Sequence, residues 1–285
     1  MTAGEALTRA TKRLAAAGVP EAALDAELLL RHVTGWDRAA LLTEPEAEVP
    51  EDAATRFLAL VGERARRRPL QHLTALQAFW RHEFRVTPAV LIPRPETEVL
   101  VEAALDLLSP TDDPVVVDVG TGSGCIALSL AGERPRAEVH ATDVSRAALD
   151  VAEDNARRLG CAPRVRFHLG DLLDPVAVLA GRVDMVVCNP PYVSAEEASA
   201  LAPEVRDHEP PLALFPPGDA YAVYRRLVPE AARTLRPGGH LLLEIGLGMS
   251  AGVTRLCEKG AFRVERIIPD LRSIPRVVVA RTPAR

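Results

Sequence analysis

The residues best suited to chemistry are Asn189, Pro190, Pro191 and Tyr192, which directly follow the apolar run 183–188. The amide oxygen of Asn189 and the backbone carbonyl of Pro190 are two hydrogen-bond acceptors, and the two prolines fix the direction of the carbonyl because they lock φ. Two acceptors on the N–H bonds of a planar nitrogen would push electron density onto that nitrogen and aim its lone pair. Tyr192 offers a flat wall for a planar group. The tetrapeptide therefore predicts a site that binds an amide or amino nitrogen and prepares it to react.

A glycine-rich turn indicates a nucleotide-like cofactor. It follows the apolar run 115–119 and comprises Gly120, Thr121, Gly122, Ser123 and Gly124. Glycines let the backbone turn sharply and let a ligand press against it. No Lys-Ser or Lys-Thr pair ends the turn, which excludes a P-loop, and Cys125 stands where a dinucleotide fingerprint would continue to its last glycine. The turn alone does not separate the remaining nucleotide cofactors.

Three aspartates end the predicted strands near this turn. Asp143 ends the second strand, where a carboxylate can accept both hydroxyls of a ribose. Asp118, near the end of the first strand, is suited to meet an amino group or to brace the turn. Asp171 follows the third strand, where an adenine edge would lie, although a loop cap explains this residue equally well.

The elements that must position these residues alternate between strand and helix. Helices are predicted over 125–131, 146–159 and 221–235, and strands over 115–119, 138–142, 165–169, 183–188, 241–245, 262–267 and 277–280. This alternation predicts an α/β fold with a parallel, doubly wound, Rossmann-like sheet. Such a sheet would bring all the strand-end residues to one edge.

The part of the chain before this sheet has a different pattern. Residues 1–75 show apolar positions at helical spacing and carry no catalytic motif, so they predict a small helical domain that packs against or recognises something. Residues 76–94 predict a β-hairpin linker, and residues 95–285 the cofactor-binding catalytic domain.

Two further segments narrow the identification. The turn 120–124 together with the tetrapeptide 189–192 resembles the class I methyltransferases that modify planar nitrogens. The segment Leu-Ile-Pro-Arg-Pro-Glu-Thr-Glu at 91–98, with Pro-Leu-Gln-His-Leu at 69–73, resembles the HemK/PrmC family, the N5-glutamine methyltransferases of class I peptide chain release factors. The likeness extends over nearly the whole chain, including the N-terminal helical domain and Leu-Glu-Ile-Gly at 243–246.

This resemblance implies an enzyme that uses S-adenosylmethionine and methylates the glutamine of a Gly-Gly-Gln motif in class I release factors. The implied catalytic residues are Asn189, Pro190 and Tyr192, and the substrate glutamine would bind at Asn189, Pro190, Pro191 and Tyr192. The cofactor would bind at Gly120, Thr121, Gly122, Ser123, Gly124, Asp143, Asp171, Leu172 and Asn189. The helical domain would dock the release factor. Leu172, where some relatives have an aromatic residue, and Met249, where a glutamine is frequent, depart from the family's pattern.

Composition limits the partners. The chain has 285 residues, 48% of them hydrophobic, and a formal net charge of −5, which does not suggest a polyanion-binding protein. No apolar stretch approaches the roughly 20 residues of a membrane span. Its four cysteines lack metal-ligand spacing and are expected to be buried free thiols in a reducing cytoplasm. We therefore expect a cytoplasmic monomer with no metal, no membrane and no direct nucleic acid partner.

Three other functions stay open at this point. A DNA or RNA base amino-methyltransferase can share the tetrapeptide but needs a basic groove and a target-recognition domain. A ribosomal-protein glutamine methyltransferase would share most of the motifs. A non-catalytic cofactor-binding adaptor would not need Asn189 and the glycine turn together.

Overall fold

The computed structural model describes the chain except for residues 109–110 and 285. Contacts divide the chain into two compact units. The first is Met1–Leu76 together with Ala202–His208, and the second is Gln77–Leu201 together with Glu209–Arg285. The predicted domain limits at 75 and 94 stay a prediction. No pattern in the sequence indicated that residues 202–208 would group with the N-terminal helices.

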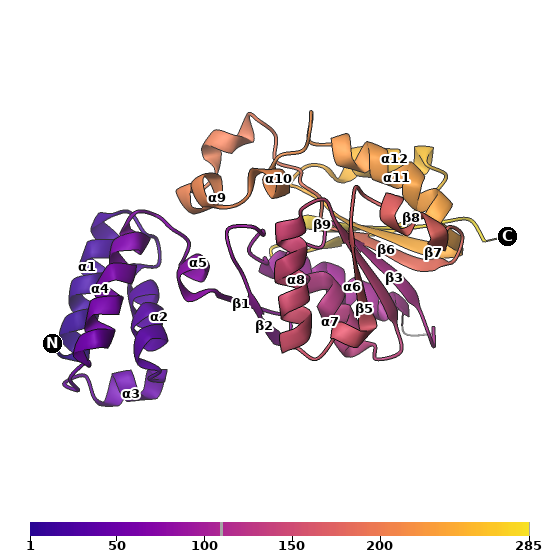
Figure 1. Ribbon diagram of the computed structural model, residues 1–285. Coiled ribbons are helices and arrows are strands. Elements are labelled where there is room, and N and C mark those ends of the chain that lie inside the picture. Colours follow the sequence, from indigo (N-terminus) through magenta and orange to yellow (C-terminus); the bar gives the residue numbers. More distant parts are fainter. Residues whose placement is uncertain (109–110, 285) are drawn as a thin grey trace. The chain divides into compact units, whose positions relative to one another are not determined.

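The first unit is helical, as the sequence predicts (Figure 1). It contains α1 (Ala3–Ala16), α2 (Ala22–Thr34), α3 (Arg38–Thr43), α4 (Glu51–Ala65), α5 (Leu70–Thr74) and α9 (Pro203–His208). A capping box of Thr2 and Glu5 begins α1, and Gly35 ends α2 in the left-handed conformation. The core of this unit is formed by fully buried apolar side chains on three helices, among them Leu14, Leu29 and Phe57.

An ion-pair cluster joins α9 to the other helices of this unit. Glu204 accepts hydrogen bonds from Arg67 Nε at 2.7 Å and Arg67 Nη2 at 2.6 Å, and Arg64 Nη2 lies 2.9 Å from the same carboxylate. Arg64 also donates to Asp25 at 2.7 Å, and both of these side chains are buried. The cluster therefore fixes a segment that is far along the chain onto the N-terminal helices.

The second unit contains a seven-stranded sheet in the order β5-β4-β3-β6-β7-β9-β8. The strands are β3 (Val115–Val119), β4 (Glu138–Asp143), β5 (Val165–Leu169), β6 (Val183–Cys188), β7 (Leu235–Glu244), β8 (Arg263–Pro269) and β9 (Pro275–Arg281). The first five strands of this order are parallel, as predicted. The last two differ, because β9 is antiparallel to β7 and to β8. Only the short turn closed by Asp270 N and Ile274 O joins β8 to β9, and so short a connection permits only an antiparallel pair.

Both faces of the sheet are covered by helices (Figure 1). On one face lie α6 (Glu98–Leu108), α7 (Cys125–Glu133) and α8 (Arg146–Arg158), and on the other α11 (Ala222–Thr234) and α12 (Ser250–Lys259). Neighbouring residues of one strand enter different cores, since Val116 packs with α6 and α7 whereas Val117 packs with α11 and α12. This explains why the central strands read as continuous apolar runs.

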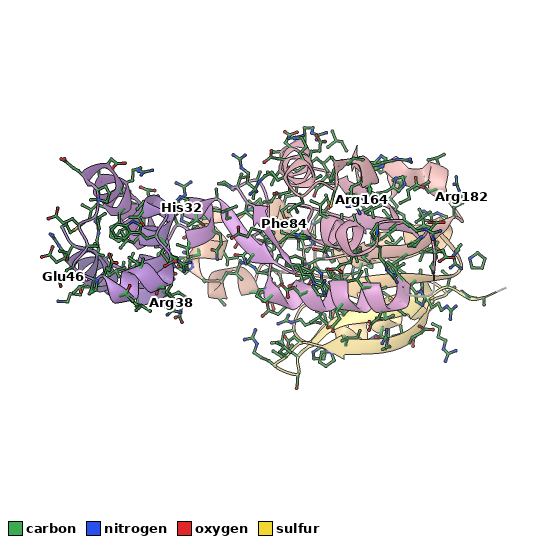
Figure 2. All side chains as sticks on the ribbon, turned by 90° about the horizontal axis from the view of Figure 1, so that it is seen from below. His32, Arg38, Glu46, Phe84, Arg164 and Arg182 are labelled. Atoms are coloured by element: carbon green, nitrogen blue, oxygen red, sulfur yellow. The ribbon has the colours of Figure 1, made fainter. Side chains whose placement is uncertain are left out.

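Shorter elements complete the second unit. The hairpin of β1 (Leu76–Phe79) and β2 (His82–Arg85) packs Phe84 against Phe79 edge to face, with ring centroids 6.0 Å apart, and Phe84 (labelled in Figure 2) is fully buried. The other elements are η1 (Pro95–Thr97), η2 (Ala162–Arg164), η3 (Asp174–Leu179), η4 (Glu197–Ala200) and α10 (Pro211–Leu214). Nowhere in the described chain is a helix both long and apolar enough to cross a membrane. All four cysteines are buried and unpaired, as expected.

The ion-pair cluster predicts a pH-dependent stability for the helical unit. Burial raises the pKa of Glu204, but the hydrogen bonds from Arg67 and Arg64 outweigh burial and lower this pKa to about 2. A carboxylate with a lowered pKa contributes stability above its unfolded pKa and loses that contribution as the pH falls through the folded value. Glu204→Gln should therefore destabilise this unit at pH 7 by about 1.5–3 kcal/mol, the range for hydrogen bonds to a charged group. The difference should shrink steadily below pH 4.

Trp36 packs against the core of the helical unit, so its fluorescence during urea unfolding in a Trp80→Phe background reports on that unit. Glu196→Gln, an exposed carboxylate near the same segment, is the matched control. An equal change of stability at pH 7 and pH 3 would contradict the ion-pair explanation.

Candidate active site

The register of the parallel strands brings the motif residues to one edge of the sheet. Val119 at the end of β3 pairs with Thr142 of β4 on one side and with Cys188 of β6 on the other, and Cys188 pairs in turn with Leu243 of β7. The residues that come next on these four strands are therefore neighbours at the carboxyl edge: Asp143, Gly120, Asn189 and Glu244. This is where open α/β sheets bind ligands.

The glycine turn after β3 presents open backbone at this edge. Gly120, Gly122 and Gly124 have φ of 71°, 56° and 82°, which L side chains rarely adopt. A Cβ atom on Gly124 would lie 3.0 Å from Leu128 Cδ1 of α7 and 3.2 Å from a Cβ atom of α8, so this glycine lets the turn pack closely against α7 and α8. A Cβ atom on Gly120 or Gly122 would meet no atom within 4 Å. The turn can therefore accept a ligand pressed against its backbone, as the sequence predicts for a cofactor.

Asp143 lies at the end of β4 and also fixes the turn. Its Oδ2 accepts the Gly122 N–H at 2.9 Å, and its Oδ1 accepts the Ser145 N–H at 2.9 Å. Burial raises the pKa of Asp143, and these N–H bonds oppose the rise. Each oxygen keeps a lone pair, so the carboxylate can still accept two hydroxyl groups. The contacts of Asp143 thus fit the expected ribose site.

Asp118 supports the glycine turn through hydrogen bonds. Its Oδ2 accepts the Thr121 hydroxyl at 2.7 Å and the Ala127 N–H at 3.2 Å, and the residue is fully buried. Burial raises the pKa of Asp118 to about 7. Its Oδ1 has no hydrogen-bond partner within the described chain. Of the two roles that the sequence allows for Asp118, these contacts fit the brace.

The other two polar members of the turn are buried. The Thr121 side chain is taken up by its bond to Asp118, and the Ser123 carbonyl oxygen accepts the Asn155 amide at 2.9 Å. Thr121 therefore offers a ligand mainly its backbone, whereas the backbone carbonyl of Ser123 is already bonded to Asn155.

The loop after β5 carries the two remaining cofactor candidates. Asp171 forms an ion pair with Arg226 of α11, and both side chains are about half exposed. Leu172 has φ of 43°, and its carbonyl accepts the Thr142 hydroxyl at 2.8 Å, which ties this loop to β4. Asp171 thus has a structural partner of its own, and its contact with an adenine edge stays a prediction, as does that of Leu172.

The tetrapeptide after β6 has a defined orientation. Asn189 donates its Nδ2 to the Thr97 hydroxyl at 3.2 Å, which leaves Oδ1 available as an acceptor. Pro190 is buried, and burial also raises the pKa of Tyr192 to about 12, so this phenol is neutral at physiological pH. A Cβ atom on Gly246 would lie 2.9 Å from Tyr192 Cδ2, so only glycine leaves room for this ring.

The tertiary structure also adds residues to which the sequence assigned no role. Thr97 comes from η1, Glu244 ends β7, and both are buried beside Asn189. Glu209 is buried as well, accepts the Ile92 N–H at 3.3 Å and pairs with Arg94. The segment 91–98 was informative as a motif, but only the fold could reveal what its side chains contact. Among the described residues, no group of three or more His, Cys, Asp or Glu side chains could hold a metal ion.

Comparison with known proteins shows which family this chain resembles. Residues 5–74 match the family model "PrmC N-terminal domain", and residues 96–205 match "Methyltransferase small domain". The chain is 47% identical to the release factor glutamine methyltransferase of Cereibacter sphaeroides over all of both chains. It is also 47% identical to the protein of the same name from Moorella thermoacetica over 98% of each chain.

Among solved structures, a methyltransferase from Pyrococcus furiosus matches 82% of this chain and 100% of its own, with a TM-score of 0.52 and 17% identity. This likeness concerns the fold alone.

Asp143 gives a direct test of the cofactor site. Asp143→Ala should weaken S-adenosylmethionine binding by about 1–3 kcal/mol, the range for losing a buried hydrogen-bond partner. Isothermal titration calorimetry measures the loss. Asp150→Ala removes an exposed carboxylate from α8 and should bind normally. An unchanged affinity in a folded Asp143→Ala variant would remove this residue from the site.

Proposed function

The chain belongs to the release factor glutamine methyltransferase family, and on this premise we propose that it methylates the side-chain amide nitrogen (N5) of a glutamine in class I peptide chain release factors. The observation that carries the proposal is the position of Asn189, which follows the strand next to the glycine turn and keeps its amide oxygen available. A methyl donor and a planar nitrogen could thus meet at this edge of the sheet.

The methyl donor is S-adenosylmethionine, which supplies an electrophilic methyl group on a sulfonium. We propose that the open backbone of residues 120–124 and the carboxylate of Asp143 hold it, because the turn leaves room for a ligand and the carboxylate retains two acceptor positions. Leu172 would add apolar packing.

The acceptor nitrogen needs help from the protein, because an amide lone pair is delocalised into its carbonyl group. We propose that Asn189 Oδ1 and the Pro190 carbonyl accept the two N–H bonds of the glutamine amide. Tyr192 would support the amide plane, and its raised pKa keeps it from adding a charge. Catalysis would then consist of positioning and fixed dipoles, which is what an in-line methyl transfer requires.

Selection of the substrate must come from a second surface. A glutamine side chain is small and neutral, so the tetrapeptide cannot distinguish one protein from thousands. We propose that the helical domain docks the release factor and that the glutamine of its Gly-Gly-Gln motif enters the site, the two glycines permitting close approach. The relatives are release factor glutamine methyltransferases, which supports a release factor over a ribosomal protein as the substrate. The net charge of −5 supports a protein over a nucleic acid as the partner.

The proposal includes a monomeric, cytoplasmic enzyme. Four buried unpaired cysteines are compatible with a reducing compartment.

Replacing Asn189 tests whether this residue serves methyl transfer more than cofactor binding. Asn189→Ala should retain its fold and most of its affinity for S-adenosylmethionine but lose turnover by about 100-fold or more, by analogy with removing one oriented hydrogen-bonding group from an active site. Transfer of a labelled methyl group to a purified release factor measures turnover, and calorimetry measures cofactor affinity. Near-normal turnover would rule out the proposed role of Asn189.

Substrate size tests the role of the helical domain. A short Gly-Gly-Gln peptide should be methylated with a much lower kcat/KM than the intact release factor, because it lacks the docking contacts. Leu42 of α3 is 72% exposed, and Leu42→Asp is a probe of docking. This change should lower kcat/KM for the intact release factor but not for the peptide. Val178→Asp, at an 83% exposed valine of the sheet unit, is its matched control. A peptide that reacts as well as the intact factor would contradict docking.

A further inference from the structure

The hydroxyl of Thr97 connects Asn189 to a buried carboxylate. Asn189 Nδ2 donates to Thr97 Oγ1 at 3.2 Å, and the same hydroxyl lies close enough to the Glu244 carboxylate to lower its pKa. Thr97 and Glu244 are each 2% exposed. Strand register independently makes Asn189 and Glu244 neighbours, because they follow the paired residues Cys188 and Leu243. Two separate observations therefore bring these three side chains together.

The direction of this hydrogen-bonded chain follows from counting donors. An ionised carboxylate has no proton to donate, so Glu244 can only accept from Thr97. A threonine hydroxyl has one proton, and once it points to Glu244 the Thr97 oxygen can only accept from Asn189. The Asn189 group facing Thr97 must then be the NH₂ group, and Oδ1 must face the other way. If this carboxamide were rotated by half a turn, its oxygen would face the Thr97 oxygen with no proton between them.

The surroundings of Glu244 determine whether its carboxyl is charged. Its Oε2 is buried and has no hydrogen-bond partner in the described part of the chain. Arg276 and Arg94 favour the charged form electrostatically, while Glu96 opposes it. The other titratable side chains facing it are Tyr192, Tyr224, Cys188 and Cys125, and burial raises the pKa of all four, so they stay neutral at physiological pH.

We propose that Glu244, acting through Thr97, is a positioning residue that fixes the Asn189 carboxamide with Oδ1 toward the substrate nitrogen. This inference rests on the proposed function and adds to it the groups that orient the catalytic amide. The tetrapeptide supplies the acceptor, and the Glu244–Thr97 pair decides which end of the amide the substrate meets.

The arrangement has a consequence for pH dependence. Burial is the main cause that raises the pKa of Glu244, to about 7, while the Thr97 hydrogen bond opposes the rise. Below this pH the protonated carboxyl can donate to Thr97, whose own proton is then free to point at Asn189. The amide could then turn its oxygen inward and present NH₂ to the substrate. The active orientation should therefore be favoured above pH 7 and lost as the pH falls through that value.

Turnover of a release factor by variants of Thr97 is the first test. Thr97→Val keeps the shape but can neither accept from Asn189 nor donate to Glu244. We therefore expect kcat to fall about tenfold or more, by analogy with removing a group that orients a metal ligand. The KM for S-adenosylmethionine should change less than twofold. Thr97→Ser restores the hydroxyl and should recover most of kcat. Thr234→Val removes another buried hydroxyl, at the end of α11, and is the matched control.

Glu244→Gln tests the titration. The wild-type kcat should rise between pH 6 and pH 8, and the variant, which cannot ionise, should have a lower kcat and lack this rise. The comparison with the variant is needed because Asp118 also has a pKa raised to about 7. The proposal would be overturned if Thr97→Val had the same kcat as the wild type, or if Glu244→Gln had the same pH profile as the wild type.

A measurement without substrate keeps this inference separate from the proposed function. The side-chain NH₂ signals of Asn189, identified by their absence in Asn189→Ala, should shift with pH in a ¹H–¹⁵N spectrum of the wild type, with a midpoint near 7. Thr97→Val leaves a Glu244 carboxyl that can still titrate, at a higher pH, but removes the hydroxyl between it and Asn189, so the Asn189 signals of this variant should not follow pH. Signals that follow pH equally in both proteins would refute the proposed connection from Glu244 through Thr97 to Asn189. If the wild type leaves release factors unmethylated, the proposed function fails. These spectra would still show whether Glu244 acts on Asn189 through Thr97.

Discussion

The site depends on one constraint, the register between neighbouring parallel strands. Because Val119, Thr142, Cys188 and Leu243 lie in one row of the sheet, the residues that follow them emerge side by side. A shift of one residue in any strand would turn its side chains to the opposite face and move its motif along the edge. The row is fixed by continuous apolar strands buried between two layers of helices. The energy that stabilises the core thus also sets the geometry of the active site.

The second condition for this site is that it contains three carboxylates shielded from water, of which Asp118 and Glu244 are buried and Asp143 is partly buried. Burial raises the pKa of Asp118, Asp143 and Glu244, because the charged form loses its water. Backbone N–H groups and threonine hydroxyls oppose this effect. Their bonds to Asp118 and Asp143 also fix the glycine turn, and Thr97 accepts a separate hydrogen bond from the tetrapeptide. The hydrogen bonds that offset the cost of burying these carboxylates thus also hold the segments that would bind the ligands. Groups with perturbed pKa values frequently gather at functional sites for this reason.

The helical unit has an organisation of its own. It recruits α9 from a late part of the chain through Glu204, which lies between two arginines. Arg64, which belongs to a run of basic residues at 64–68, is buried and forms two ion pairs. An ion pair between residues more than a hundred positions apart leaves no periodic or local trace in a sequence, so it could not have been anticipated.

The sequence by itself determined the α/β class, the strand and helix positions, the glycine turn and the tetrapeptide, because these depend on local propensity, periodicity and short motifs. It also identified the family, since segments such as 91–98 are specific even where their contacts are unknown. Only the tertiary structure decided that β8 and β9 run antiparallel, that the Asp171 carboxylate pairs with Arg226, and that Thr97 stands between Asn189 and Glu244. Those features are set by which strands pair and by which buried donor meets which acceptor. Both are properties of the packed chain, and residues far apart in sequence contribute to them together.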